Sequence, residues 1–322
     1  MKRLLAYLFT FWAVLTLNFF LPRLMPGDPL AALFEPGSNE FVSDETMRAR
    51  LAAYYGLDRP LSEQYVEYLR GTITGDMGWS IALNESVGEL IRTRLPWTLL
   101  LTLTALTLAS FIGVMTGAEA AWARGTWPDR LQVTANTVIS NMPVFFVGPM
   151  LLVFFGAKMR WFPLSGAHAP FAKYDSTFAG FADVFWHLVL PSLTLTLSLI
   201  GSKFLLVRNS MVGVLSEDFM LVARAKGLPT KRLKLHHALR NAILPFVQQL
   251  AAQAGLAITG AVFVETTFDY PGMGRLIFNA VGSRDYPLMQ GVFLVVALAV
   301  LFANLCADVI NARLDPRAAS PP

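Results

Sequence analysis

The chain has 322 residues, of which 54% are hydrophobic and only 15% are charged. This balance excludes an ordinary soluble domain of this length and indicates a membrane protein. A net charge of +4 does not point to nucleic acid, because the basic residues lie beside apolar runs, as expected of cytoplasmic loops. The single cysteine, Cys306, excludes a disulfide framework and a cysteine-rich metal site.

An apolar run at residues 4–21 follows Lys2 and Arg3. It could be the core of a signal peptide or a first transmembrane helix. The run is long for a signal peptide, and residues 21–25 (LPRLM) offer no small-residue cleavage site. We therefore expect a retained transmembrane helix in residues 1–22, with its N-terminus in the cytoplasm.

Residues 23–96 form a polar region that we expect to lie outside the cell membrane. Residues 23–97 carry eleven acidic side chains against seven arginines and no lysine, a net charge of −4. Residues 203–240, by contrast, carry eight basic side chains and two acidic ones. Because Lys and Arg are enriched in cytoplasmic loops, the two segments are predicted to lie on opposite sides of the membrane.

Five further apolar runs each have about the 20 residues needed to cross a hydrocarbon core. They are residues 97–118, 133–156, 187–207, 243–264 and 288–310. Six crossings place both termini in the cytoplasm. The expected fold is all-α: a polytopic membrane protein with six transmembrane helices. Five of them lie in a core at residues 97–311, with a cytoplasmic loop at 208–242 and a cytoplasmic tail at 312–322.

Asn136, Ser140 and Asn141 place polar side chains at helical spacing in the third run, shortly before Pro143 and Pro149. We expect this helix to be bent or broken near the middle of the membrane. Its polar edge should face other helices or a water-filled path, since lipid cannot satisfy it. These three residues are therefore candidates for a translocation pathway, and plain hydrogen bonding between helices is the alternative.

Other polar and small residues in the apolar runs are less informative. Gly113 and Gly117 form a GxxxG pair, which is a helix-packing signal of low specificity. Glu119, Glu265 and Asp308 are expected at helix ends, where a carboxylate reaches water.

The sequence contains no constellation that would make the chain an enzyme. It has no phosphate-binding loop of the pattern G-x-x-x-x-G-K-[ST] and no HExxH or paired-cysteine metal site. His236 and His237 are adjacent, so we expect them to point to different faces of a helix. We therefore expect no catalytic residue, no metal and no cofactor bound by this chain, and any nucleotide hydrolysis must come from another chain.

The stretch Ser216–Pro245 is polar and basic, and it is predicted to form two short helices that meet at Gly227. Ser216 can cap the first helix, and only glycine enters the left-handed region freely, so Gly227 suits the position after its end. Pro229 is placed to open the second helix.

Each of these two helices has a predicted apolar face, listed here as Phe219, Val222 and Ala223 for the first and Leu228, Leu235, Leu239 and Ala242 for the second. Two interpretations stay open. The segment is a compact knob presented to a partner, or an amphipathic surface pair that holds a loop in place.

Several motifs resemble those of one family, the inner-membrane permease subunits of dipeptide and oligopeptide ABC importers, of the first-permease type. The N-terminal half matches -R-L-x-P-G-D-P- at Arg23–Pro29, -Y-G-L-D-x-P-L-x-x-Q-Y- at Tyr55–Tyr65 and -G-D-x-G-x-S- at Gly75–Ser80. Within the basic stretch, Ala223–Leu228 (ARAKGL) and His237–Pro245 (HALRNAILP) match the peptide-permease form of the cytoplasmic signature.

The chain departs from the generic signature E-A-A-x-x-x-G, because Leu221–Ala223 stand at the E-A-A positions and the glutamate is missing. Towards the C-terminus, three further motifs resemble the family's loop between the last two helices. They are Val264–Thr266 (VET), Pro271–Leu276 (PGMGRL) and Arg284–Pro287 (RDYP).

The resemblance implies the MetI-like core of a type I ABC importer permease, with a large external loop after helix 1, in the bacterial inner membrane. It further implies a coupling helix before Gly227 that enters a cleft of an ATP-binding subunit, with ATP and Mg used by that subunit. The implied coupling residues are Phe219, Val222, Ala223, Arg224, Ala225, Lys226 and Gly227. The implied partners are a second, unlike permease, two ATP-binding subunits and an extracytoplasmic solute-binding protein.

The implied cargo is a peptide. A nickel chelate, glutathione or a modified peptide is the alternative, because related permeases carry each of these. A membrane scaffold, or a membrane-embedded enzyme that only borrows the loop, is the competing hypothesis of another class. The missing energy source and the paired helices around Gly227 favour transport, since a scaffold needs neither.

Overall fold

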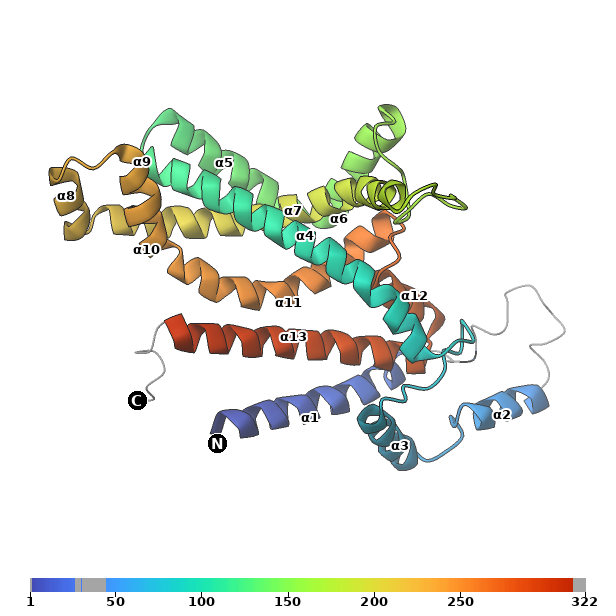
Figure 1. The fold of residues 1–322 in the computed structure, drawn as a ribbon. Coiled ribbons are helices and arrows are strands. Elements are labelled where there is room, and N and C mark those ends of the chain that lie inside the picture. Colours follow the sequence, from blue (N-terminus) through green and yellow to red (C-terminus); the bar gives the residue numbers. More distant parts are fainter. Residues whose placement is uncertain (1, 27–29, 31–44, 315–322) are drawn as a thin grey trace. The chain divides into compact units, whose positions relative to one another are not determined.

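The computed structural model of the chain describes residues 2–26, 30 and 45–314 (Figure 1). The Gly27–Pro29 part of the first family motif and the tail from residue 315 lie outside the described residues. The described part is helical and contains no β strand, only an isolated bridge between Trp79 and Ser86. This confirms the all-α prediction.

The chain divides into two compact units, each with its own core. Unit 1 comprises Met1–Trp97 and Pro271–Ala299, and unit 2 comprises Thr98–Tyr270 and Val300–Pro322. The two units are described separately below.

Three helices in the described part are long and apolar enough to cross a membrane. They are α4 (Val87–Trp122), α7 (Thr177–Leu215) and the Tyr286–Val309 part of α13 (Tyr286–Leu314). The other two unbroken apolar runs of the sequence coincide with α1 (Lys2–Arg23) and α11 (Leu244–Thr267).

The remaining apolar run, residues 133–156, forms a helix pair broken near Pro143, as the prolines predict. The helix α5 (Trp127–Asn141) and the Val144–Lys158 segment meet at an angle of 98° and qualify as a span only as a pair. Pro143 has no N–H group and disfavours helical backbone at the residue before it. Met142 is accordingly extended, with ψ at 126°. After α6 (Val144–Leu151) the chain continues as a π helix, η2 (Leu152–Lys158).

The helices run well beyond the apolar runs that predicted them. α4 begins at Val87 and α7 at Thr177, ten residues before the starts predicted at residues 97 and 187. Ser176 caps α7 by accepting a hydrogen bond from the Ala179 N–H group. At 1.5 Å per residue the 39 residues of α7 reach about 58 Å, nearly twice a hydrocarbon core of about 30 Å. Hydropathy therefore predicted only the most apolar part of each helix.

Unit 1 is organised around the start of α4, the helix α12 (Met273–Ser283) and the first turns of α13. Their buried apolar side chains form one cluster, which includes Val87, Ile91, Met273, Leu276 and Met289. The polar region adds α2 (Glu45–Tyr54) and α3 (Leu61–Thr74).

A buried carboxylate joins two of the family motifs of unit 1 through hydrogen bonds. Asp285 is fully buried. Its Oδ2 accepts from the Ser80 hydroxyl at 2.5 Å and from the Ala82 N–H at 2.9 Å, while its Oδ1 accepts from the Leu288 N–H at 3.1 Å. The first two bonds hold the end of the -G-D-x-G-x-S- motif against the RDYP motif, and the third caps α13.

In unit 2, α4 packs on α7 through the GxxxG pair. A β-carbon built on Gly117 would lie 2.7 Å from the Phe204 carbonyl oxygen, and one built on Gly113 would lie 2.8 Å from the Lys203 β-carbon. Neither position has room for a larger residue. The packing role predicted for the pair is confirmed.

Candidate functional site

The predicted two-helix segment is present at one end of unit 2 (Figure 1). The first helix, α8 (Asp218–Ala225), has Asp218 in its first turn, as the helix dipole favours. The prediction that Ser216 caps this helix is wrong. Ser216 still has the helical backbone of the end of α7, and its hydroxyl donates to the Gly213 carbonyl at 2.6 Å.

The break between the helices is where the sequence placed it. Gly227 has a φ of +68°, in the left-handed region that glycine enters without penalty. Pro229 is extended and precedes the next helix, α9 (Thr230–Arg232). Both predictions are confirmed.

α8 has two distinct apolar sides, and the predicted single face is split between them. Met220 and Ala223 are buried in the core of unit 2, against a cluster that includes Met211, Leu233 and Ala238. The opposite side is open, with exposed fractions of 41% for Phe219, 69% for Leu221 and 53% for Val222. Ala223 therefore anchors α8 to its own chain, while Phe219 and Val222 remain available to another molecule.

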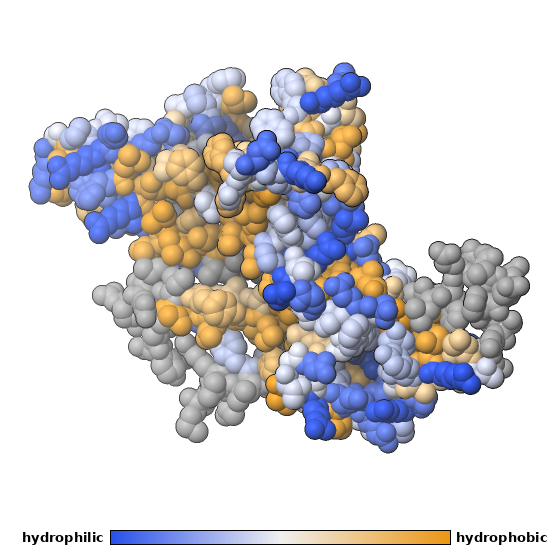
Figure 2. All heavy atoms as spheres, turned by 45° about the vertical axis from the view of Figure 1, so that its right-hand side comes forward, coloured by the Kyte–Doolittle hydropathy of each residue, from blue (hydrophilic) through white to orange (hydrophobic). Residues whose placement is uncertain are grey.

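The rest of the predicted coupling stretch is exposed as well. Arg224, Ala225, Lys226 and Gly227 all lie on the surface. Further along, Lys231, Arg232 and Arg240 are exposed, whereas Lys234 pairs with Glu119 at the end of α4. Figure 2 shows hydrophilic side chains gathered over this end of unit 2, beside an apolar surface. The exposed apolar side of α8 thus belongs to a segment whose exposed charged side chains are mostly basic.

The second helix departs from the predicted face because its middle is a π helix, η3 (Leu233–Leu239), followed by α10 (Arg240–Ala242). Hydrogen bonds from i to i+5 widen each turn, so α-helical spacing misplaces the side chains. Leu239 and Ala242 are buried as predicted, but Leu235 is exposed, and Leu233 and Ala238 take the inner positions. His236 and His237 do not point away from each other as predicted, because their rings lie edge to face with their centroids 5.4 Å apart.

The candidate pathway residues make local hydrogen bonds. Asn136 donates to the Gln132 carbonyl at 2.9 Å, Ser140 to the Asn136 carbonyl at 2.6 Å and Asn141 to the Thr137 carbonyl at 2.7 Å. Ser140 also lies against α7, where a β-carbon on Gly201 would come within 1.6 Å of its hydroxyl oxygen. Asn141 is exposed. A role in translocation remains a prediction for all three.

Two buried hydrogen-bonded pairs join α11 to α7 and to α4. Lys203 was counted with the cytoplasmic basic residues, but it is fully buried and its Nζ donates to Gln253 Oε1 at 2.6 Å. Glu265 was expected at a helix end that reaches water, but it is fully buried and accepts from the Thr98 hydroxyl at 2.6 Å. Glu265 lies near the end of α11 as predicted but does not reach water, and the cytoplasmic placement of Lys203 remains a prediction. Glu119 and Asp308 are exposed as expected.

A buried ion pair joins α5 to α7. The Arg208 guanidinium donates from Nε to Asp129 Oδ1 at 2.7 Å and from its second terminal nitrogen to Oδ2 at 2.8 Å. The Gly125 N–H adds a third bond to this carboxylate at 2.9 Å. No sequence pattern links residues 79 positions apart, so this bidentate pair could be found only in the structure.

Comparison with known proteins agrees with this architecture. Residues 109–320 match the family described as "Binding-protein-dependent transport system inner membrane component". A "Putative peptide permease protein" of Brucella ovis is 38% identical over 319 residues, which cover 98% of this chain and 97% of that protein. The glutathione transport system permease protein GsiC of Escherichia coli K12 is 36% identical over 315 residues, with coverage of 98% and 96%.

Proposed function

Because this chain belongs to the family of binding-protein-dependent transport inner-membrane components and is a permease of the ABC importer type, we propose that it forms one half of a peptide translocation path. The other half is a second, unlike permease. A solute-binding protein delivers the cargo on the outer face, and two ATP-binding subunits on the inner face supply the energy with ATP and Mg.

The open side of α8 is the observation that carries this proposal. Phe219, Leu221 and Val222 stay exposed although the same helix buries Met220 and Ala223 in its own core. An anchored helix with a second apolar side is suited to enter a cleft of another protein and to transmit a rigid-body motion. The chain has no phosphate-binding loop, so the ATPase must be that other protein.

The names of the relatives support a peptide cargo. One relative is named as a peptide permease and the others as glutathione permeases. Glutathione is itself a small modified peptide, so both names point to short peptides with free charged ends. Transport of labelled candidate solutes in a deletion strain separates peptides, glutathione and nickel chelates.

The orientation of the chain in the membrane is inferred from the distribution of charged residues between its polar segments. Residues 23–97 have a net charge of −4, while residues 203–240 are strongly basic, so the second segment belongs in the cytoplasm. Reporter fusions near Arg59 should read as external, and fusions near Lys231 and after Arg317 as cytoplasmic. A cytoplasmic reading at Arg59 would contradict the arrangement.

The decisive experiment changes Gly227 to valine. A β-branched residue at a φ of +68° is strained, at about 1–2 kcal/mol, although no other atom lies within 4 Å of the new β-carbon. The bundle should still insert, but α8 should run on or re-aim. We expect normal membrane abundance, loss of uptake and weaker copurification of the ATP-binding subunits.

Gly213→Val is the matched control, because Gly213 also has open space around it and lies in α7 without a left-handed backbone. It should leave uptake and copurification near the wild-type level. Normal uptake by Gly227→Val would show that α8 is not the coupling element. ATPase activity from the purified single chain would remove the need for a separate ATP-binding subunit.

A further inference from the structure

The loop between η2 and α7 in unit 2 carries positive charge, although it is predicted to be external. Residues 158–176 contain three basic side chains, Lys158, Arg160 and Lys173, against the single carboxylate of Asp175. All three basic side chains are exposed, and none of them forms an ion pair within the described part of the chain. The positive-inside rule does not explain them, because it concentrates Lys and Arg in cytoplasmic loops.

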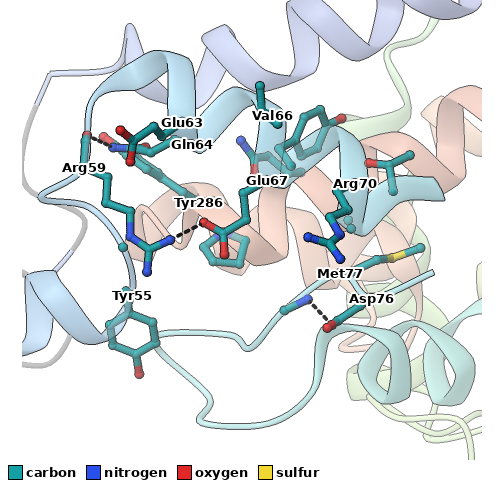
Figure 3. A pocket seen from close by; sticks show the side chains of 18 of the residues that line it. Tyr55, Arg59, Glu63, Gln64, Val66, Glu67, Arg70, Asp76, Met77 and Tyr286 are labelled. Carbon is teal, nitrogen blue, oxygen red and sulfur yellow. Dashed lines mark hydrogen bonds and ion pairs between the residues drawn. The ribbon is translucent and has the colours of Figure 1, made fainter. Parts of the chain in front are cut away.

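The polar region of unit 1, predicted to lie on the same side, has the opposite balance of charge. Residues 23–97 have a net charge of −4. Arg59 of this region pairs with Glu67 at 2.9 Å beside a cavity of about 860 Å³ (Figure 3). An anionic surface should therefore repel this region of unit 1 and attract the loop of unit 2.

The α6–η2 segment that leads into the loop has an exposed face without a polar side chain. Its exposed residues between 145 and 157 are Phe145, Phe146, Pro149, Met150, Val153, Phe154 and Ala157. The other side of α6 is buried, with Val147, Gly148 and Leu151 inside. The segment thus has one face for its own chain and a second apolar face that its own chain leaves uncovered.

The first turns of α7, which follow the loop, have the same character. Phe178, Phe181 and Phe185 recur at helical spacing and are 80%, 70% and 63% exposed. Asp183 lies on the other side of the helix, where its carboxylate accepts from the Tyr174 hydroxyl at 2.6 Å and holds the loop against α7. The exposed face of these turns is therefore apolar as well.

The bend after α5 determines how the α6–η2 segment can lie in a membrane. The 15 residues of α5 reach about 22 Å, which is less than a hydrocarbon core of about 30 Å. The Val144–Lys158 segment then turns by 98°. With α5 along the bilayer normal, this segment lies nearly in the plane of the membrane, on the side that α5 approaches, and Lys158 stands at its end.

Lipid fits these two apolar faces better than a protein that binds and leaves. Interfaces of transient complexes are about as polar as the rest of a protein surface, whereas these faces expose no polar side chain. Trp161 and Trp186 are also exposed here, and tryptophan is enriched where membrane meets water. The Trp186 ring lies 4.8 Å from the Phe162 ring, so the loop packs on α7 at this point.

We propose that α6, η2 and the first turns of α7 lie in the interfacial layer of the membrane, and that Lys158, Arg160 and Lys173 bind the phosphate groups of anionic phospholipids. The apolar faces then contact acyl chains, while the long basic side chains reach the headgroups. Attraction of this kind acts only within about a Debye length of the lipid surface. The proposal goes beyond peptide transport, and only the choice of the outer leaflet rests on the orientation proposed above.

The first test measures depth, with the full chain carrying Cys306→Ser in nanodiscs of phosphatidylcholine and phosphatidylglycerol. A nitroxide label is placed at Phe181→Cys or Val153→Cys, both exposed positions. Oxygen, which collects among acyl chains, should relax either label more than a water-soluble nickel chelate does. Lys231→Cys, exposed in the basic segment, is the control and should show the reverse. Stronger relaxation by the nickel chelate at Phe181 or Val153, or access by neither reagent, would overturn the proposal.

The second test measures the preference for anionic lipid. A bimane label at Val153→Cys is quenched by brominated lipid, with bromine on phosphatidylglycerol or on phosphatidylcholine in otherwise equal mixtures. Brominated phosphatidylglycerol should quench at least about twofold more strongly, because the basic side chains concentrate it nearby. Changing Lys158, Arg160 and Lys173 together to glutamine should make the two lipids quench equally.

The matched control removes three exposed basic side chains from the other end of unit 2, with Lys231, Arg232 and Arg240 changed to glutamine. It should keep the preference for phosphatidylglycerol. Equal quenching in the chain with all its basic residues, or the same preference after loss of Lys158, Arg160 and Lys173, would overturn the proposal.

A protein partner and the orientation of the chain are tested separately. If the label at Phe181 loses its access to oxygen when the second permease or a solute-binding protein is added, that protein covers the face and the proposal is wrong. Access to oxygen that persists in the assembled transporter supports lipid. Neither measurement depends on which side is external, so a cytoplasmic reporter at Arg59 would reject the proposed orientation and leave the contact with lipid standing.

Discussion

Two regions of unit 2 differ in whether the chain itself covers or pairs their side chains. Where α4 and α5 pack on α7, the buried carboxylate of Asp129 is paired with Arg208, and glycines remove any gap between the helices. At α8, apolar side chains stay on the surface although the helix already has a buried side. The first region is completed by its own chain, and the second leaves apolar side chains uncovered. Substitutions in the first should therefore affect folding, and those in the second assembly.

The largest effect is expected from Arg208→Met. Asp129 keeps a side chain that is only 3% exposed but loses its cation, and an unpaired buried charge costs about 3–5 kcal/mol. Membrane abundance and the thermal unfolding midpoint in detergent should both fall sharply. The double variant Arg208→Met with Asp129→Leu removes both charges and should recover most of the loss. Failure of this rescue would mean that the pair does more than neutralise a charge.

Gly117→Ala is expected to have the second-largest effect. Its new β-carbon would meet the Phe204 carbonyl oxygen at 2.7 Å, and backbone cannot give way as a flexible side chain can. Separating α4 from α7 should lower stability by about 1–3 kcal/mol. The thermal unfolding midpoint of the purified chain measures this loss of stability. An unchanged midpoint would show that the two helices do not hold each other closely.

The double variant Phe219→Ala with Val222→Ala should weaken assembly with the ATP-binding subunits and leave stability nearly unchanged. Both side chains are exposed, so stability should change by no more than about 0.5 kcal/mol. Copurification of the ATP-binding subunits should weaken by about tenfold or more, as expected for apolar anchors in a partner's cleft. Met220→Ala is the contrasting control, because Met220 is fully buried and its loss should lower stability. Equal copurification by the Phe219 and Val222 variant and the wild type would reject α8 as a docking surface.

Gly213→Ala should give the smallest effect, and in the opposite direction. Gly213 lies in α7 with no atom near the site of a new β-carbon. Alanine there should raise stability by about 0.5–1 kcal/mol, because glycine loses more conformational freedom on folding. A loss of stability would show that α7 needs to bend at this point.

Features that depend on one or two neighbouring residues could be predicted from the sequence, and features that depend on distant segments could not. The bend at Pro143 and the break at Gly227 depend on the backbone chemistry of one or two residues, and both were predicted. The burial of Lys203 and Glu265 depends on the side chains that other helices bring against them, which hydropathy does not report. The Asp129–Arg208 pair depends on segments far apart in the chain, and no local pattern contains it.

The face of the second helix was predicted in part, and the error is instructive. Leu239 and Ala242 fit α-helical spacing, whereas Leu235 does not, because η3 bonds from i to i+5. Glycine, proline and apolar periodicity carry no sign of a π helix. The two-helix segment was thus located correctly along the chain, while the side chains that it leaves exposed needed the structure.

The π helix η3 also has a consequence in evolutionary terms. A π segment contains one residue more than the α helix that would span the same length, and it often arises where a residue has been inserted into a helix at a functional site. Deleting a single residue within Leu233–Leu239 should restore the α register and rotate everything before the deletion, α8 included, relative to α11. In this chain, the number of residues in this short basic helix is therefore expected to set the direction in which the exposed side of α8 points.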